Sequence, residues 1–303
     1  MKEVSCNYCG SSDYKVIYGE KLSAVDDSWD FTCTNDHHGE HYRVVKCNLC
    51  GLFYSSPRPD GKNLEVNYNL VEDSNYKSEI EGRKKTFQRN LKNVLRFKIK
   101  GDLLDVGCAL GVFLAEAQKK EWSVSGIEPS EWCVNQCREL FDLQDVVVGT
   151  YRNLSCFGRK FDLVTMWDVL EHLDDPLVAL KNCADVLNED GILAFSTVNI
   201  GSIYAKILGK RWPWLMKMHI YYFDKKTIRQ YLKKIGFEIL EIRQYKHTIS
   251  ADYLLYKLKR INKILYYTVV FIKRIIFLDR NIYLTVCMGD FMEVYARRIE
   301  RTI

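Results

Sequence analysis

The clearest pattern along the chain is an alternation of short apolar runs with segments of helical period. Apolar runs bounded by turn residues are typical of buried strands, and they occur at 103–106, 122–127, 145–149, 161–166 and 191–196. Apolar residues recur every three or four positions at 112–117, 130–140 and 176–187. Because strands and helices alternate, the pattern predicts an α/β fold with a doubly wound, Rossmann-like sheet.

The C-terminal part continues this pattern with longer interruptions. Asp224 begins a segment of helical period that ends at Gly236, and strands are expected at 237–243 and 288–297. Between these strands, apolar residues recur at steps of three and four opposite a basic face, which predicts an amphipathic helix over about 250–278. We expect this helix to pack on its own domain or on a dimer partner. The alternative is peripheral contact with an anionic membrane.

Two CxxCG motifs mark the N-terminal part, residues 1–60. They supply four thiolates, which is the ligand set of a closed tetrahedral zinc site. The expected ligands are Cys6, Cys9, Cys47 and Cys50. The potential ligands between the motifs lie in a polar, turn-rich stretch and are expected to be bystanders: Cys33, His37, His38 and His41. The spacing therefore predicts a small zinc-ribbon module with structural Zn²⁺.

A glycine-rich turn joins the first central strand to its helix. Gly107 and Gly111 let the backbone come close to a ligand, and the helix amides that follow would face it. The next strand ends at Glu128, where nucleotide-binding α/β folds accept hydrogen bonds from ribose hydroxyls. The block WDVLEHLDDP, which begins at Trp167, follows another strand at the same edge of the sheet. These three features together predict a nucleotide site.

The same features resemble motifs of the class I S-adenosylmethionine-dependent methyltransferases. The resemblance implies a seven-stranded sheet whose last strand is antiparallel, with S-adenosyl-L-methionine as cofactor. Ala109 departs from it, because glycine is commoner there. No acidic residue follows the third strand, so Thr150 or Tyr151 is expected near the adenine. The implied cofactor-binding residues are Asp105, Gly107, Ala109, Gly111, Glu128, Thr150, Tyr151 and Asp168.

A zinc ribbon followed by an aromatic strand and Pro57-Arg58-Pro59 is similar to the head of a group of bacterial methyltransferases. This group includes sugar C-methyltransferases and many proteins encoded near surface-glycan genes. The implied organisation is a ribbon over 1–60, a linker with a cofactor-covering helix over 61–98, and a methyltransferase domain over 99–303. Tyr68 and Tyr76 line the site or are ordinary packing aromatics. The aromatic-rich insertion 199–223 is expected to bind the acceptor.

Two histidines are the candidate catalytic residues. Methyl transfer to a hydroxyl requires alignment and a proton acceptor, and a histidine suits the second task. His172 and His219 are therefore expected to be catalytic, although each has a structural alternative as the residue that orders a loop. Asp168-x-x-Glu171-His172 also resembles the arrangement by which some quinone and small-RNA O-methyltransferases hold Mg²⁺, but the block is common in metal-free relatives.

Composition narrows the class of protein. The 303 residues are 47% hydrophobic with a net charge of +5, and the basic residues are dispersed, which disfavours nucleic acid. The 11 cysteines and an N-terminus without a signal pattern favour the cytoplasm, with the inner membrane face as a peripheral alternative. No apolar run reaches the roughly 20 residues that span a bilayer.

The sequence thus predicts an O-methyltransferase for a sugar, glycan or carrier-bound intermediate of cell-surface polysaccharide or secondary-metabolite biosynthesis. A zinc-headed RNA methyltransferase is one alternative, and it would need a contiguous basic face. A non-catalytic scaffold that retains the cofactor fold is another. A dehydrogenase would require a nicotinamide cofactor instead.

Overall fold

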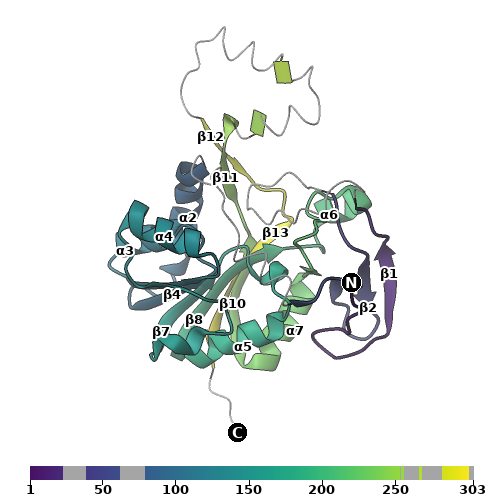
Figure 1. The fold of residues 1–303 in the computed structure, drawn as a ribbon, viewed down its shortest axis with the longest axis horizontal. Coiled ribbons are helices and arrows are strands. Elements are labelled where there is room, and N and C mark those ends of the chain that lie inside the picture. Colours follow the sequence, from purple (N-terminus) through teal and green to yellow (C-terminus); the bar gives the residue numbers. More distant parts are fainter. Residues whose placement is uncertain (23–38, 62–78, 253, 256–265, 268–281, 300–303) are drawn as a thin grey trace.

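A seven-stranded central sheet organises the protein, in the order β10-β13-β8-β7-β4-β5-β6 (Figure 1). The computed structural model describes residues 1–22, 39–61, 79–252, 254–255, 266–267 and 282–299. The central strands are β4 (Asp102–Val106), β5 (Ser123–Glu128), β6 (Val146–Val148), β7 (Phe161–Met166), β8 (Leu187–Val198), β10 (Phe237–Gln244) and β13 (Phe291–Arg298). Strands β4 to β8 run parallel to one another, whereas β13 runs antiparallel to β8 and β10. The predicted α/β class, strand number and antiparallel last strand are confirmed.

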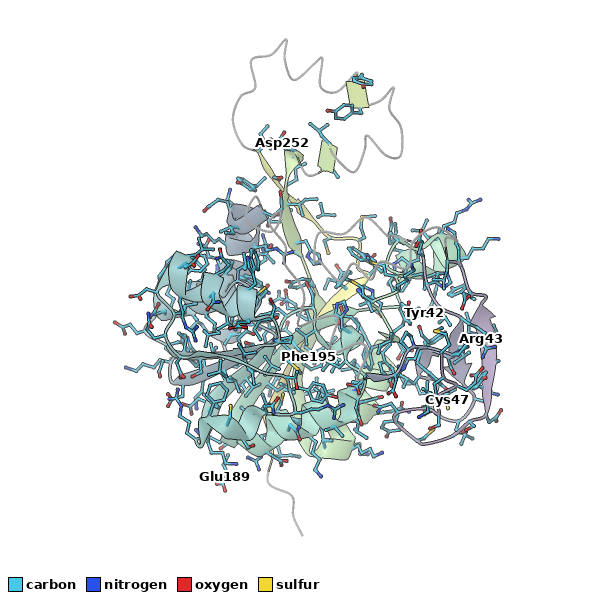
Figure 2. All side chains as sticks on the ribbon, viewed as in Figure 1. Tyr42, Arg43, Cys47, Glu189, Phe195 and Asp252 are labelled. Carbon is cyan, nitrogen blue, oxygen red and sulfur yellow. The ribbon has the colours of Figure 1, made fainter. Side chains whose placement is uncertain are left out.

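Helices cover both faces of this sheet (Figure 1). Helices α2 (Ile80–Val94), α3 (Val112–Gln118) and α4 (Glu131–Phe141) bury one face, and α5 (Pro176–Val186) and α7 (Lys225–Ile235) bury the other. Phe195 is fully buried in the middle of the sheet, and Glu189 lies exposed near the start of β8 (Figure 2). Because both faces are covered, the central strands read as continuous apolar runs.

The helix boundaries follow the capping residues in the sequence. Ser130 accepts a hydrogen bond from the amide of Cys133 at the start of α4. Asp224 begins α7 as predicted, and Gly236 ends it in the left-handed conformation at φ 86°. Two boundaries were wrong: β8 begins at Leu187 rather than at residue 191, and β13 begins at Phe291 rather than at residue 288. Leu187 pairs with Phe161 ahead of a register shift, and this pairing continues β8 through Asp190 and Gly191.

The N-terminal module contributes a second sheet. Strands β1 (Tyr14–Tyr18), β2 (Val44–Cys47) and β3 (Phe53–Ser55) form an antiparallel meander, and β3 also pairs with β9 (Tyr221–Tyr222) of the expected acceptor segment. The ribbon and the segment 199–223 therefore share one four-stranded sheet. The Pro57-Arg58-Pro59 stretch after β3 is packed here, since Arg58 is only 6% exposed.

Shorter elements complete the described chain. They are the 3₁₀ helices η2 (Leu154–Phe157), η3 (Leu170–His172) and η4 (Gly209–Arg211), helix α6 (Ile203–Leu208), and the antiparallel pair β11 (His247–Ser250) and β12 (Tyr283–Val286). Most of the predicted helix 250–278 lies outside the described residues, as do Cys33, His37, His38, Tyr68 and Tyr76. Within the described ranges, every helix is too short or too polar to span a bilayer.

Candidate active site

The glycine turn between β4 and α3 has an unusual backbone. Gly107, Ala109 and Gly111 all have positive φ, at 75°, 48° and 74°. A Cβ atom on Gly107 would lie 2.8 Å from Cγ2 of Val169, so glycine is required there for space as well as for conformation. The turn is thus held directly against the DVLEH block.

Glu128 lies beside this turn, as the sequence predicted. Its Oε2 accepts a hydrogen bond of 2.9 Å from the Ala109 amide, and its Oε1 accepts one of 3.1 Å from the Ser130 amide. Burial raises the pKa of Glu128 to about 7, and these two amides act in the opposite direction. Each oxygen keeps a second lone pair, so the carboxylate can also accept hydrogen bonds from the hydroxyls of a nucleotide ribose.

Asp105 is buried behind the turn rather than exposed at it. It is 2% exposed, and it accepts a hydrogen bond of 2.7 Å from the hydroxyl of Thr165 on the neighbouring strand β7. Burial raises its pKa to about 8; the Thr165 bond opposes this shift, and the nearby charge of Glu128 adds to it. The side chain of Asp105 therefore links two central strands.

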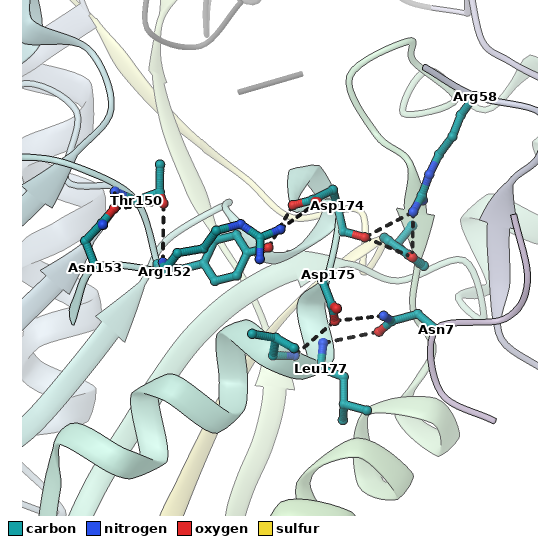
Figure 3. A network of polar contacts seen from close by, with 11 residues as sticks. Asn7, Arg58, Thr150, Arg152, Asn153, Asp174, Asp175 and Leu177 are labelled. Atoms are coloured by element: carbon teal, nitrogen blue, oxygen red, sulfur yellow. Dashed lines mark hydrogen bonds and ion pairs between the residues drawn. The ribbon is translucent and has the colours of Figure 1, made fainter. Parts of the chain in front are cut away.

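The loop after β6 makes its polar contacts with the chain itself. The Tyr151 hydroxyl donates to Oδ1 of Asp174 and Arg152 to its Oδ2, each at 2.7 Å (Figure 3). The Thr150 hydroxyl lies 3.3 Å from Oδ1 of Asn153. This loop is thereby tied to the end of the DVLEHLDDP block.

The DVLEH block places a buried carboxyl group at the edge of the sheet. Asp168 has φ 56°, and its amide and Oδ1 both bond to the hydroxyl of Ser196. Glu171 is fully buried; its Oε2 accepts a bond from Thr197, and its Oε1 has no partner among the described residues. Burial, followed by the charge of Asp168, raises the pKa of Glu171 to about 8.

The two candidate histidines come together at this position. The ring centroids of His172 and His219 are 4.8 Å apart. His172 Nδ1 lies 3.1 Å from the carbonyl of Met218, and His219 Nδ1 lies 2.9 Å from that of Trp214. Since a carbonyl can only accept, both rings carry a proton on Nδ1. Burial lowers the pKa of His172 to about 4, so it is neutral near pH 7.

Glu171, His172 and His219 also form a possible metal-binding group. One ligand atom from each lies within 4.8 Å of the others. Two imidazoles and one carboxylate suit a borderline dication such as Zn²⁺ or Fe²⁺ better than the hard Mg²⁺ ion. The expected Mg²⁺ arrangement included Asp168, whereas in the structure His219 joins the group and the Asp168 carboxylate bonds to Ser196.

The four predicted zinc ligands are adjacent in the ribbon. The sulfurs of Cys6 and Cys50 are 3.3 Å apart, and those of Cys9 and Cys47 are 3.5 Å apart. A tetrahedral zinc ion with Zn–S bonds of about 2.3 Å places its sulfurs about 3.8 Å apart, so the cluster fits this ion. Burial acts to raise the pKa of Cys47, but bonds from the backbone amides of Cys50 and Leu49 outweigh it and lower the pKa to about 7. These amides thus favour the thiolate at Cys47, whereas burial raises the pKa of Cys50 to about 11 and also raises that of Cys6.

Two residues near the candidate active site were missed by the sequence analysis. Asp290 accepts hydrogen bonds from the indoles of both Trp212 and Trp214, at 3.1 and 2.8 Å. His247, at the start of β11, packs against Phe291. Both residues lie far along the chain from the motifs. The one local signal of a functional residue was the charged Asp290 directly before an apolar strand.

Comparison with protein families identifies a match over most of this region. A family model described as a methyltransferase domain matches residues 80–242, which is more than half of the chain. A ubiquinone biosynthesis O-methyltransferase of Histophilus somni is 35% identical over 107 residues, covering 32% of this chain and 44% of the relative. One from Coxiella burnetii is 33% identical over 102 residues, covering 32% and 43%. The chain therefore spans less than half the length of these curated relatives.

The matches among solved structures are more distant in sequence. An S-adenosylmethionine-dependent methyltransferase from Clostridium acetobutylicum is 13% identical with a TM-score of 0.49, covering 72% of this chain and 92% of that one. A possible histamine N-methyltransferase from Thermotoga maritima is 19% identical with a TM-score of 0.48, covering 72% and 90%.

Proposed function

Because this chain belongs to the methyltransferase domain family, we propose that it transfers the methyl group of S-adenosylmethionine to a hydroxyl oxygen of a small or carrier-bound acceptor. The observation that carries the proposal is the placement of Glu128 beside the glycine turn, with the DVLEH block packed against the same turn. The names of the curated relatives support oxygen as the acceptor atom.

The chain's own residues would act mainly by alignment and proton removal. When bound, the cofactor supplies a methyl group that its sulfonium already activates. Glu128 would hold the ribose, and the glycine turn would admit the nucleotide. His219, with His172 beside it, would accept the hydroxyl proton at Nε2 as the oxygen bonds to the methyl carbon and the sulfur–carbon bond breaks. Alignment of this kind can contribute about 7–11 kcal/mol, and a general base about 10²–10⁴-fold.

Two classes of acceptor fit this proposal. The ring-rich segment 199–223 suits a sugar, glycan or carrier-bound intermediate of cell-surface polysaccharide or secondary-metabolite biosynthesis. The relatives named for ubiquinone biosynthesis suggest a planar ring instead. In either case, we propose a structural zinc ion on the ribbon and a cytoplasmic location, with the segment 250–278 as the possible contact with a membrane surface.

A labelled-methyl transfer assay tests the proposed function. Purified protein is incubated with methyl-labelled S-adenosylmethionine and with sugar-nucleotide, lipid-linked, phenolic and RNA fractions. His219→Ala and His172→Ala are expected to slow transfer while cofactor affinity, measured by calorimetry, stays close to that of the wild type. Cofactor binding with no transfer to any fraction would favour the non-catalytic scaffold. Binding of a nicotinamide nucleotide in its place would contradict the proposal.

A further inference from the structure

We propose that His247 belongs to an acceptor-binding wall and that the acceptor it receives is a planar ring with one or two hydroxyl groups. The wall consists of Trp167, Trp214, Tyr245, His247 and Phe291. This inference rests on the proposed function, which it narrows to a class of substrate.

The wall is a continuous series of packed rings. The His247 ring lies 4.4 Å from Tyr245 and 4.9 Å from Phe291, nearly perpendicular to both. Phe291 meets Trp214 edge to face at 4.7 Å, and Tyr245 lies parallel to Trp167 at 6.5 Å. Trp167 and Tyr245 directly follow β7 and β10, His247 and Phe291 lie in β11 and β13, and Trp214 belongs to the segment 199–223. The wall therefore exists only in the folded protein.

One end of the wall contacts the histidine pair of the candidate active site, and the other end contacts the helix after the glycine turn. Trp214 stacks on His219 with 6.3 Å between ring centroids, and its carbonyl bonds to the same histidine. At the other end, Trp167 packs at 5.1 Å against Phe113 of α3, the helix that follows the glycine turn. A ligand on this wall would therefore lie close to both the cofactor turn and the proposed base.

Two polar atoms of the wall have no partner in the described part of the chain. They are Nε2 of His247 and Nε1 of Trp167, and both are shielded from solvent. Buried polar groups in folded proteins are nearly always hydrogen-bonded, because leaving one unpaired costs free energy. A bound hydroxyl group at each atom would remove this cost, which is a reason to place the ligand here.

The balance of rings and polar atoms determines the class of ligand. A sugar would bury several hydroxyl groups, whereas this wall offers two unpaired polar atoms among five rings. Each further hydroxyl left unpaired would lose on the order of tenfold in affinity or more. A phenol-like ring buries one or two hydroxyls and gains favourable ring contacts. The chemistry of the wall therefore suits a hydroxylated aromatic ring.

A pair of substitutions separates hydrogen bonding from ring packing. His247→Phe keeps a ring but removes Nε2, whereas the side-chain amide of His247→Gln can replace Nε2. The probe is catechol, and methyl β-glucoside is the matched saccharide. Binding of each is measured by calorimetry in the presence of S-adenosylhomocysteine. Methyl transfer to each is measured with labelled S-adenosylmethionine. We expect catechol to bind and to accept methyl groups. His247→Phe should raise its Kd and KM on the order of tenfold, with little change for His247→Gln.

The control measurement is the affinity for S-adenosylhomocysteine, which should be the same in all three proteins. Wild-type protein that binds this nucleotide but transfers methyl groups to methyl β-glucoside and not to catechol would overturn the inference and leave the proposed function intact. Equal KM values for the wild type and His247→Phe would also overturn it. Failure of the wild type to bind the nucleotide would instead contradict the proposed function.

Discussion

Asn7, inside the first cysteine motif, donates a hydrogen bond of 2.8 Å to Oδ1 of Asp175, the residue that caps α5 (Figure 3). Its own Oδ1 accepts bonds from the Leu177 amide at 3.2 Å and from the Tyr231 hydroxyl at 3.0 Å. Arg58, after the second motif, adds a bond of 3.0 Å to the Asp174 carbonyl. The turn of the first cysteine motif is therefore joined to the helix that follows the DVLEHLDDP block, and the ribbon supports the candidate active site.

Substitution of Asn7 should destabilise the whole protein. Asn7→Ala leaves the Leu177 amide and the Tyr231 hydroxyl without their partner, at a cost of about 1–3 kcal/mol in the free energy of unfolding. Asn48 provides the matched control, because it has the same place in the second motif but bonds Asp13 at an exposed position. Asn48→Ala should cost less than about 0.5 kcal/mol. Chemical denaturation measures both, and equal losses would show that the ribbon does not support the domain in this way.

Removal of one zinc ligand should abolish metal binding. Cys47→Ala leaves three thiolates, which no longer close a tetrahedral site, so the bound zinc per chain should fall from about one to near zero. Because metal binding stabilises so small a module, its melting should broaden and shift to lower temperature. Cys156→Ala, at an exposed cysteine outside the cluster, should keep its zinc. Elemental analysis of the purified proteins decides the matter, and retention of zinc by Cys47→Ala would refute the assignment.

Replacing Ala109 by glycine should stabilise the protein. Ala109 has φ 48°, and the left-handed conformation costs a residue with a Cβ atom about 1–2 kcal/mol, part of which the greater entropy of unfolded glycine offsets. We expect Ala109→Gly to gain about 0.5–1 kcal/mol. Ala115→Gly, inside α3, should instead lose about 1 kcal/mol. Urea denaturation of the two variants gives the comparison, and a loss of stability in Ala109→Gly would be the contrary result.

Asp105 should make stability depend on pH. Its folded pKa of about 8 lies above the ordinary value, so the native state keeps a proton that the unfolded chain releases. Stability from this group is therefore full below about pH 4 and falls by about 1.4 kcal/mol per pH unit as the pH rises toward 8. Asp105→Asn, which can still accept the Thr165 bond, should remove this contribution and leave the part of the slope that comes from Glu128 and Glu171, whose pKa values burial also raises. Denaturation curves between pH 5 and 8 measure it, and an unchanged slope would exclude Asp105 as its source.

Asp290 should hold the two tryptophans of the acceptor segment. Asp290→Ala leaves the indole N–H groups of Trp212 and Trp214 unpaired, and we expect a loss of about 2 kcal/mol or more. Asp290→Asn retains an acceptor oxygen and should lose less than half of this. Thermal unfolding gives the stabilities, and tryptophan emission should move to longer wavelength in the alanine variant alone. The same emission spectrum in all three proteins would argue against this role.

The sequence determined the elements whose causes are local. The alternation of apolar runs with helical segments specified the central strands, because burial on both faces requires continuous apolar residues. Turn and capping chemistry placed the glycine turn, Ser130 and Asp224 correctly. A positive φ favours glycine, and the first amides of a helix, which have no partner within the helix, favour a capping side chain. The four-cysteine cluster was predictable for a similar reason, because ligand spacing within each motif is a short-range property.

His219 reaches His172 because the acceptor segment turns back to pair β9 with β3, and no periodicity near either histidine encodes that contact. His247 and Asp290 join the site through strands that follow it by many residues. Such contacts depend on how distant elements bury their apolar faces together. That is a cooperative property of the packed chain, which local residue patterns do not carry.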